Sequence, residues 1–227
     1  MRALSFLALL VGLAGSLTST GAFAGYQGAP SDEWAACDNQ SFPKLTGQDR
    51  IDACKQFLSY GRSRMGNDTI YVFTFANISL GYAELGDYAD ALSWIETAIS
   101  KLYGVSSNIK SNYDYMWWSR EAIYNTKLGN YDASDADITI ATSTEMGKSF
   151  MIPWAEPWHW DELKGDNAMG RGDYTAAESL YRNYEQHVKP ARPGLAEKIA
   201  AAHASAHGGQ AETITVDSAC AMFPEMC

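Results

Sequence analysis

The chain has 227 residues, of which 46% are hydrophobic and 19% are charged. This length suits one compact domain or one short solenoid. Its 27 acidic and 17 basic side chains give a net charge of −10, and no segment gathers Lys or Arg. This balance argues against nucleic acid and anionic membranes as partners, because both attract basic surfaces.

Residues 1–24 have the pattern of a secretory signal peptide. Arg2 precedes an apolar run from Ala3 to Ala14, and Ala22-Phe23-Ala24 supplies the small residues of a cleavage site. Cleavage after Ala24 would place the mature chain in the periplasm or outside the cell. The apolar run is too short to cross a bilayer, and no later apolar stretch is long enough, so we expect no membrane span.

The four cysteines agree with export, because an even number in an exported chain is typical of disulfides. Four cysteines allow three pairings, and nearness in the sequence favours Cys37–Cys54 and Cys220–Cys227. None of them has the Cys-x-x-Cys spacing of a metal site, so we prefer structural disulfides to a bound metal.

Residues 25–47 contain Pro30 and Pro43 and are predicted to be a mostly irregular strap. A short helix is predicted at 48–60, because apolar residues recur there at helical spacing. Its buried stripe would consist of Ile51, Cys54, Phe57 and Leu58.

A three-residue motif then occurs three times, 43 residues apart: Gly86-Asp87-Tyr88, Gly129-Asn130-Tyr131 and Gly172-Asp173-Tyr174. Glycine suits the left-handed position that ends a helix, and Asp or Asn is a good N-cap for the next one. Each motif therefore predicts a tight turn between two antiparallel helices. The predicted helices are 69–85, 88–101, 113–128, 131–145, 158–170 and 174–188, followed by a terminal capping helix at 194–206.

The first copy has the clearest packing pattern, with Phe75, Ser79 and Tyr82 before the turn and Ala91-Leu92, Ile95 and Ala98 after it. This pattern resembles the tetratricopeptide repeat over roughly residues 68–190. The period differs, since it is 43 residues here and 34 in that family. The extra residues fall in 102–112 and 147–156. The resemblance implies an all-α, TPR-like α-solenoid of about three helix pairs. Residues 25–67 would form an N-terminal strap and capping helix, and 191–227 a C-terminal capping helix and disulfide tail.

The segment before the repeats carries a second resemblance. Cys37 is followed by Arg50-Ile51-Asp52-Ala53-Cys54 and then by the first repeat. This order resembles a group of exported repeat proteins from alphaproteobacteria. The resemblance implies a Gram-negative periplasm and a helix that caps the first repeat.

In tetratricopeptide arrays the first helix of each pair lines a concave groove, which can hold an extended peptide or a helix of an unidentified protein. The alternative is that the groove is covered by the N-terminal strap or the C-terminal tail. The corresponding positions here are Phe73, Ala76 and Leu80, then Met116, Ser119 and Ile123, then His159, Glu162 and Asp166.

Five of the seven tryptophans fall within 44 residues: Trp117, Trp118, Trp154, Trp158 and Trp160. Core packing is the first explanation, and Trp118 matches a packing position of the repeat. Trp154 and Trp158 stand beside prolines between repeats, where exposed rings could bind a glycan. A carbohydrate- or cell-wall-binding accessory protein is therefore the alternative function.

His203 and His207 are four residues apart on a predicted helix and could face one metal ion, but no third ligand lies near them in the sequence. We therefore expect neither a metal site nor another cofactor. The sequence also has no nucleophile elbow, His-Glu-x-x-His motif or P-loop. These observations predict a non-catalytic scaffold for protein–protein interaction.

Overall fold

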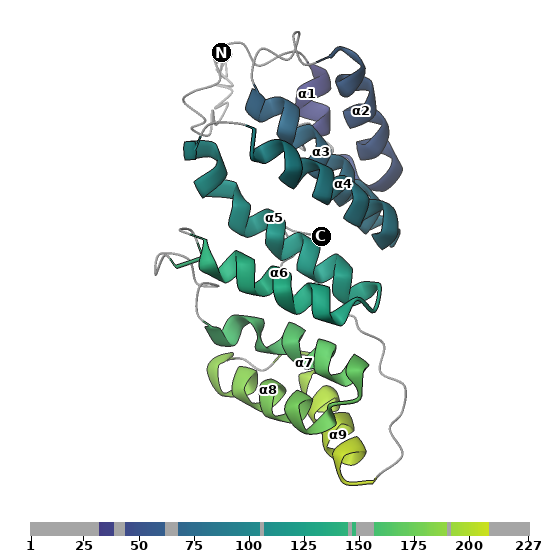
Figure 1. Cartoon of the computed structure of the whole chain (residues 1–227). Helices are drawn as coiled ribbons and strands as arrows, with labels where there is room; N and C mark the ends of the chain where they lie inside the picture. Colours follow the sequence, from purple (N-terminus) through teal and green to yellow (C-terminus); the bar gives the residue numbers. More distant parts are fainter. Residues whose placement is uncertain are drawn as a thin grey trace, which may run out of the picture.

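The computed structural model describes residues 32–38, 44–61, 68–104, 107–144, 147–148, 157–189 and 192–208. Within these ranges the regular structure is entirely helical, and successive helices stack in sequence order from one end of the molecule to the other (Figure 1). The predicted all-α solenoid is confirmed. Three predicted features lie outside the described residues: the signal peptide, the Cys220–Cys227 bond and Trp154.

The helices correspond closely to those expected from the spacing of apolar residues. Two differences stand out. Residues 32–37, predicted to be irregular, form a helix, and the helix predicted at 113–128 begins earlier, inside the segment that lengthens the repeat. The elements are α1 Asp32–Cys37, α2 Gly47–Ser59, α3 Asp68–Glu84, α4 Tyr88–Leu102, α5 Ser107–Lys127, α6 Tyr131–Ser143, the 3₁₀ turn η3 Pro157–Trp160, α7 Asp161–Arg171, α8 Tyr174–His187 and α9 Leu195–Ala206.

The three repeated turns have nearly the same geometry. Gly86, Gly129 and Gly172 have φ values of 78°, 79° and 80°, a conformation that glycine adopts without strain. In each turn the amide of the residue after the glycine donates to a carbonyl five residues back, at 2.8–3.0 Å. The predicted role of the glycine is therefore confirmed.

The N-caps are less uniform. The Asp87 and Asp173 side chains each accept a hydrogen bond from an amide in the first turn of α4 or α8. Asn130 makes no such bond, and its Nδ2 instead donates to Asn125 Oδ1 at 3.2 Å. The predicted capping role is correct for the two aspartates and wrong for Asn130, because the Asn130 side chain is hydrogen-bonded to Asn125 instead.

Small residues lie where the two helices of each pair approach each other. Ser79 is buried and donates from Oγ to the carbonyl of Ala91 at 2.7 Å. At Gly165 an added Cβ would lie 2.4 Å from the ring of Tyr181, so only glycine fits against this ring without a shift. The pairs are therefore packed closely, as the repeated small positions predict.

The tyrosines of the first two turns, Tyr88 and Tyr131, reach the next pair. Tyr88 lies 6.2 Å from Tyr124 between ring centroids, and the ammonium of Lys127 lies over its ring. Tyr131 packs against Gly170 on α7, where an added Cβ would lie only 2.0 Å from the ring. These contacts connect neighbouring helix pairs.

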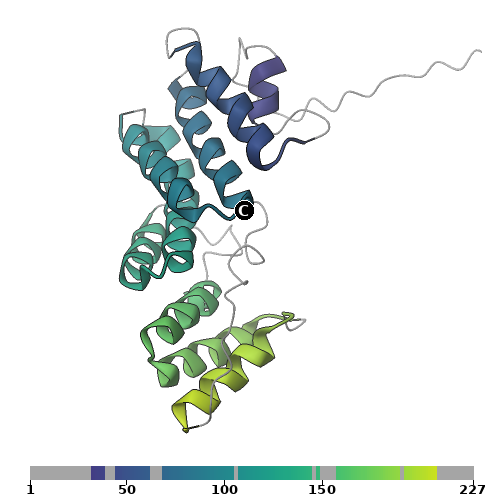
Figure 2. The ribbon, with the colours of Figure 1, turned by 90° about the vertical axis from the view of Figure 1, so that its right-hand side faces the viewer.

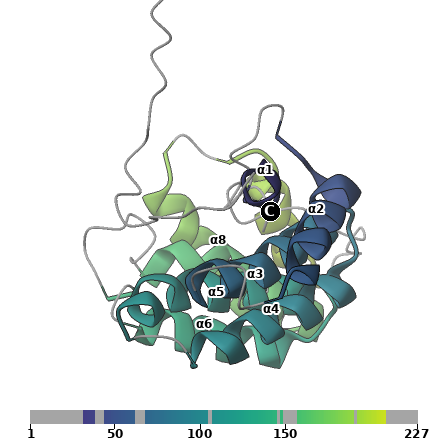
Figure 3. The ribbon, with the colours of Figure 1, turned by 90° about the horizontal axis from the view of Figure 1, so that it is seen from above.

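Three apolar clusters follow one another along the stack. The N-terminal cluster joins α1, α2 and α3, the central cluster extends from α3 to α7, and the C-terminal cluster joins α7, α8 and α9. A view turned by 90° shows α9 at the far end of the stack from α1 (Figure 2), and the view from above shows the labelled helices overlying one another (Figure 3). Among the described helices, none combines the length and apolar character needed to cross a membrane.

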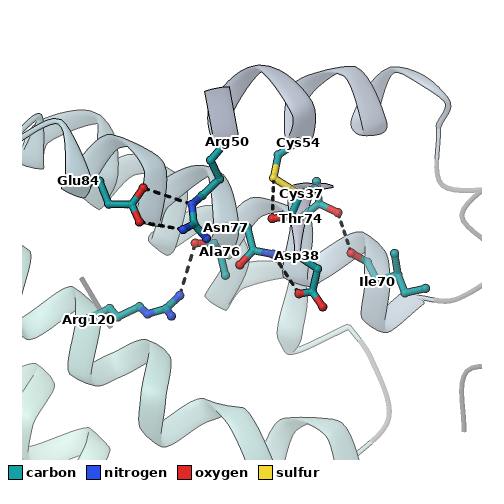
Figure 4. The surroundings of a disulfide bond; sticks show 10 residues. All are labelled: Cys37, Asp38, Arg50, Cys54, Ile70, Thr74, Ala76, Asn77, Glu84 and Arg120. Carbon is teal, nitrogen blue, oxygen red and sulfur yellow. Dashed lines mark hydrogen bonds and ion pairs between the residues drawn. A yellow bond between two sulfur atoms is a disulfide. The ribbon is translucent and has the colours of Figure 1, made fainter. Parts of the chain in front are cut away.

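The first helices are fastened to the stack by specific bonds (Figure 4). The predicted disulfide between Cys37 and Cys54 is present and links α1 to α2. The Arg50 guanidinium donates to both carboxylate oxygens of Glu84, at 2.8 and 3.2 Å, and so links α2 to α3. Trp34 packs 5.4 Å from Phe57 between ring centroids.

Candidate functional site

The predicted groove positions of α3 and α5 differ in their access to solvent. Ala76 and Leu80 on α3 are buried, and Ser119 and Ile123 on α5 are fully buried. Ser119 also donates from Oγ to the carbonyl of Tyr115 on its own helix. These four side chains therefore belong to the interior, and a partner could reach them only if the helices separated.

Phe73 and Met116 are the two predicted groove residues of α3 and α5 that stay half-exposed. The Phe73 ring meets Tyr113 edge-on at 4.5 Å and Trp117 at 5.4 Å between centroids. Trp117 is fully buried, whereas Tyr113 is half-buried. Phe73, Tyr113 and Met116 all pack against the central core, and we call these three residues the aromatic patch.

In the third pair the predicted groove is occupied by the chain itself. Glu162 and Asp166 on α7 are buried, and Lys198 of α9 lies against both. The Lys198 ammonium is 2.6 and 2.9 Å from the two Asp166 oxygens and 3.1 Å from Glu162 Oε1. The predicted acidic end of the groove is thus a buried charge network that holds the terminal helix.

Further contacts complete this network. Arg192 donates to Glu162 Oε2 at 3.0 Å, and the Tyr181 hydroxyl donates to Asp166 Oδ1 at 2.8 Å. Burial raises the pKa of Tyr181, and the negative charge of Asp166 adds to this effect. Burial lowers the pKa of His159 to about 4, with a further contribution from the positive charge of Arg192.

Trp158, the second residue of η3, is half-buried. Its ring stacks on His187 at 5.3 Å between centroids, with an angle of 9° between the planes. Tyr184 lies beside it, at 6.2 Å. His187 therefore covers one face of the Trp158 ring. The other tryptophan suggested for glycans, Trp154, lies outside the described residues.

A pair of buried acids lies in the middle of the stack. Burial raises the pKa of Glu121 on α5 to about 8, and the negative charges of Asp137 and Glu96 raise it further. Burial raises the pKa of Asp137 on α6 to about 6, although the hydrogen bond from Asn125 opposes this rise. No sequence pattern indicates this pair, because the burial depends on how α5 and α6 pack.

The structure brings a third polar group to the two histidines of α9. Glu178 on α8 has both carboxylate oxygens 3.1 Å from His203 Nδ1. The rings of His203 and His207 are 4.5 Å apart between centroids. One potential ligand atom from each of the three side chains lies within 4.8 Å of the others. Sequence reasoning missed Glu178, because it precedes His203 by 25 residues and belongs to another helix.

Comparisons with known proteins give no relative: no family model, no curated protein sequence and no solved structure matches this chain.

Proposed function

We propose that this protein is a non-catalytic scaffold that binds a protein or peptide partner outside the cytoplasm. The stack of helix pairs supports the proposal, because an array in which each unit contacts its neighbours presents a long surface to a partner. The three repeated turns and the resemblance to tetratricopeptide repeats point in the same direction.

The aromatic patch carries the proposal. Phe73, Tyr113 and Met116 come from the first helices of two successive pairs, and each keeps part of its side chain exposed. Aromatic residues and methionine are enriched at protein interfaces, where rigid rings contribute a large area at a small entropic cost. The patch thus combines two predicted groove residues, Phe73 and Met116, with their neighbour Tyr113, and a partner can reach it without moving a helix.

The proposed location depends on two features. Residues 1–24 have the signal-peptide pattern, and disulfides such as Cys37–Cys54 persist in oxidising compartments. We propose the periplasm or the exterior of a Gram-negative cell. Fractionation of the native host, followed by N-terminal sequencing, should find the protein outside the cytoplasm with Gly25 as its first residue. A cytoplasmic protein that starts at Met1 would contradict this location.

Site-specific photo-crosslinking tests the binding surface. A photoreactive amino acid replaces Met116 in the aromatic patch and, as a matched control, Ser93, which is exposed on α4. In cells of the native host, Met116 should give a protein adduct that Ser93 does not give. Mass spectrometry of that adduct would identify the partner.

The adduct from position 116 should also weaken when Phe73 is replaced by Ala, provided that circular dichroism shows an unchanged helix content. Identical adducts from positions 116 and 93, or none from position 116, would contradict the proposed surface. Quenching of the tryptophan fluorescence by glycan fragments would instead favour the carbohydrate-binding alternative.

A further inference from the structure

We propose that Glu178, His203 and His207 form a binding site for a divalent transition-metal ion such as Zn²⁺. The site lies at the C-terminal end of the stack and is independent of the proposed partner surface. It joins two helices, because Glu178 belongs to α8 and both histidines are on or next to α9.

The distances suit a metal ion. Zinc bonds of 2.0–2.1 Å in a tetrahedral site place the ligand atoms about 3.4 Å apart. His203 Nδ1 is already 3.1 Å from both oxygens of Glu178. The closest ligand atoms of all three residues lie within 4.8 Å of one another. Small rotations of exposed side chains would therefore complete the coordination geometry.

The backbone holds the three ligands in place. Glu178 follows Ala177 and His203 follows Ala202, and both alanines are fully buried in the C-terminal cluster. The Lys198 network fastens α9 to α7 one turn before His203. A metal ion would therefore find its ligands on two helices that are already docked, which reduces the entropic cost of binding.

Arg182 orients the carboxylate. Its Nε and one terminal nitrogen both donate to Glu178 Oε1, at 2.9 and 2.7 Å, and this interaction lowers the pKa of Glu178. Oε2 accepts neither of these bonds. Fixing a ligating carboxylate by a hydrogen bond to its second oxygen is the usual arrangement around protein-bound metals.

The donor set selects the class of metal. Imidazole suits Zn²⁺, Cu²⁺ and Ni²⁺, whereas Ca²⁺ and Mg²⁺ require oxygen ligands throughout. Three protein ligands leave room for water, and the His203 side chain is 56% exposed, so an ion can enter from solvent. Histidine binds a metal ion only in its neutral form, so binding should weaken in acid.

Calorimetric titration with ZnCl₂ tests the site. The whole chain is used with its disulfide intact, without a polyhistidine tag and after treatment with a chelator. We expect one ion per chain, and a dissociation constant that rises at least tenfold in each of His203→Ala, His207→Ala and Glu178→Gln. His187→Ala, which removes an exposed histidine elsewhere on α8, should leave the dissociation constant unchanged.

The variants affect exposed or half-exposed side chains, and circular dichroism checks that each one folds. Titration with Co²⁺ gives a second readout, since visible absorption bands should appear in the wild type and disappear in His203→Ala. Absence of binding below millimolar Zn²⁺ would overturn the proposal. Binding that survives either histidine substitution would also overturn it. Binding that needs both histidines but tolerates Glu178→Gln would refute a site that joins the two helices.

Discussion

At the N-terminal end of the stack a covalent bond, large apolar side chains and one ion pair, Arg50–Glu84, hold the outermost helices, whereas at the C-terminal end a network of several buried charges holds the last helix. The N-terminal cluster contains Trp34, Phe57 and three isoleucines, together with the Cys37–Cys54 bond. The C-terminal cluster has three alanines, two tyrosines, one leucine and one isoleucine, and α9 is fastened by Lys198 between Glu162 and Asp166.

The two ends of the stack are therefore covered in different ways. A stack of helix pairs leaves an apolar face at each end, and a capping helix must cover it. Apolar contacts weaken gradually when one side chain is trimmed. A buried charge network behaves differently, because removing one member leaves its opposite charges desolvated and unbalanced. We therefore expect the C-terminal end to be the more sensitive to single substitutions and to pH.

The largest effect is expected when the charge network loses its cation. Lys198→Met leaves the buried carboxylates of Glu162 and Asp166 without the ammonium group, and we expect the free energy of unfolding to fall by about 3–5 kcal/mol. Urea unfolding followed by circular dichroism measures the change. Adding Glu162→Gln and Asp166→Asn should restore most of the loss. A triple variant as unstable as Lys198→Met would show that packing, not charge, holds this end.

Removal of the disulfide sharpens the comparison from the other end. In the chain-entropy model a loop as short as that between Cys37 and Cys54 contributes about 3 kcal/mol, so Cys37→Ala with Cys54→Ala should lower the stability by about that amount. Hydrogen exchange should accelerate in α1 and α2 and stay unchanged in α8 and α9. An equal acceleration at both ends would mean that the stack unfolds as one unit, and this result would contradict the expected difference between the ends.

The buried acids of the middle pair, Glu121 and Asp137, should make the stability of the protein depend on pH. Because the pKa of Glu121 is raised to about 8 in the folded protein, the folded state binds more protons, and stability should fall as the pH rises from about 4.5 to 8. Glu121→Gln should remove the part of this fall that Glu121 causes, with little effect at pH 4. At pH 9 it should add about 2 kcal/mol, less than the ~5 kcal/mol of a full shift, because solvent screens a carboxylate that is not completely buried. Denaturant midpoints across this range measure the change, and Glu185→Gln, at an exposed position on α8, is the control.

The smallest effect concerns His159 at the C-terminal end. Its pKa is lowered to about 4 in the folded protein, so the unfolded chain takes up the proton first, and stability should fall as the pH drops from about 6.5 towards 4. Relative to His159→Gln, the wild type should lose about 1 kcal/mol between pH 7 and pH 5. The same loss in the variant would assign the acid sensitivity to another group.

Local chemistry explains why most of the fold was predictable. A glycine with positive φ and a following Asp specify the turn within a few residues, and apolar spacing specifies the helices. The helix α1 was missed because it has only six residues, and such a short helix depends on its contacts, here the disulfide and the packing of Trp34 on Phe57.

The candidate site was less predictable, because access to a groove depends on contacts between distant segments. Glu162 pairs with Lys198, which is 36 residues later in the chain, and no local sequence pattern indicates this pairing. Ile123 lies at one of the predicted groove positions, yet the packing around α5 buries it completely. Glu178 joins His203 for the same reason, through the docking of α9 on α8.

The contact of Tyr131 with Gly170 has a consequence for the shape of the whole molecule. The turn tyrosine of one pair lies against a residue of the next, and that residue is Lys127 in the first instance and Gly170 in the second. Because the side chain at this position lies between two units, we expect its size to affect the angle between them. A single exchange between glycine and a larger residue would be enough to change the curvature at one joint while leaving each pair intact.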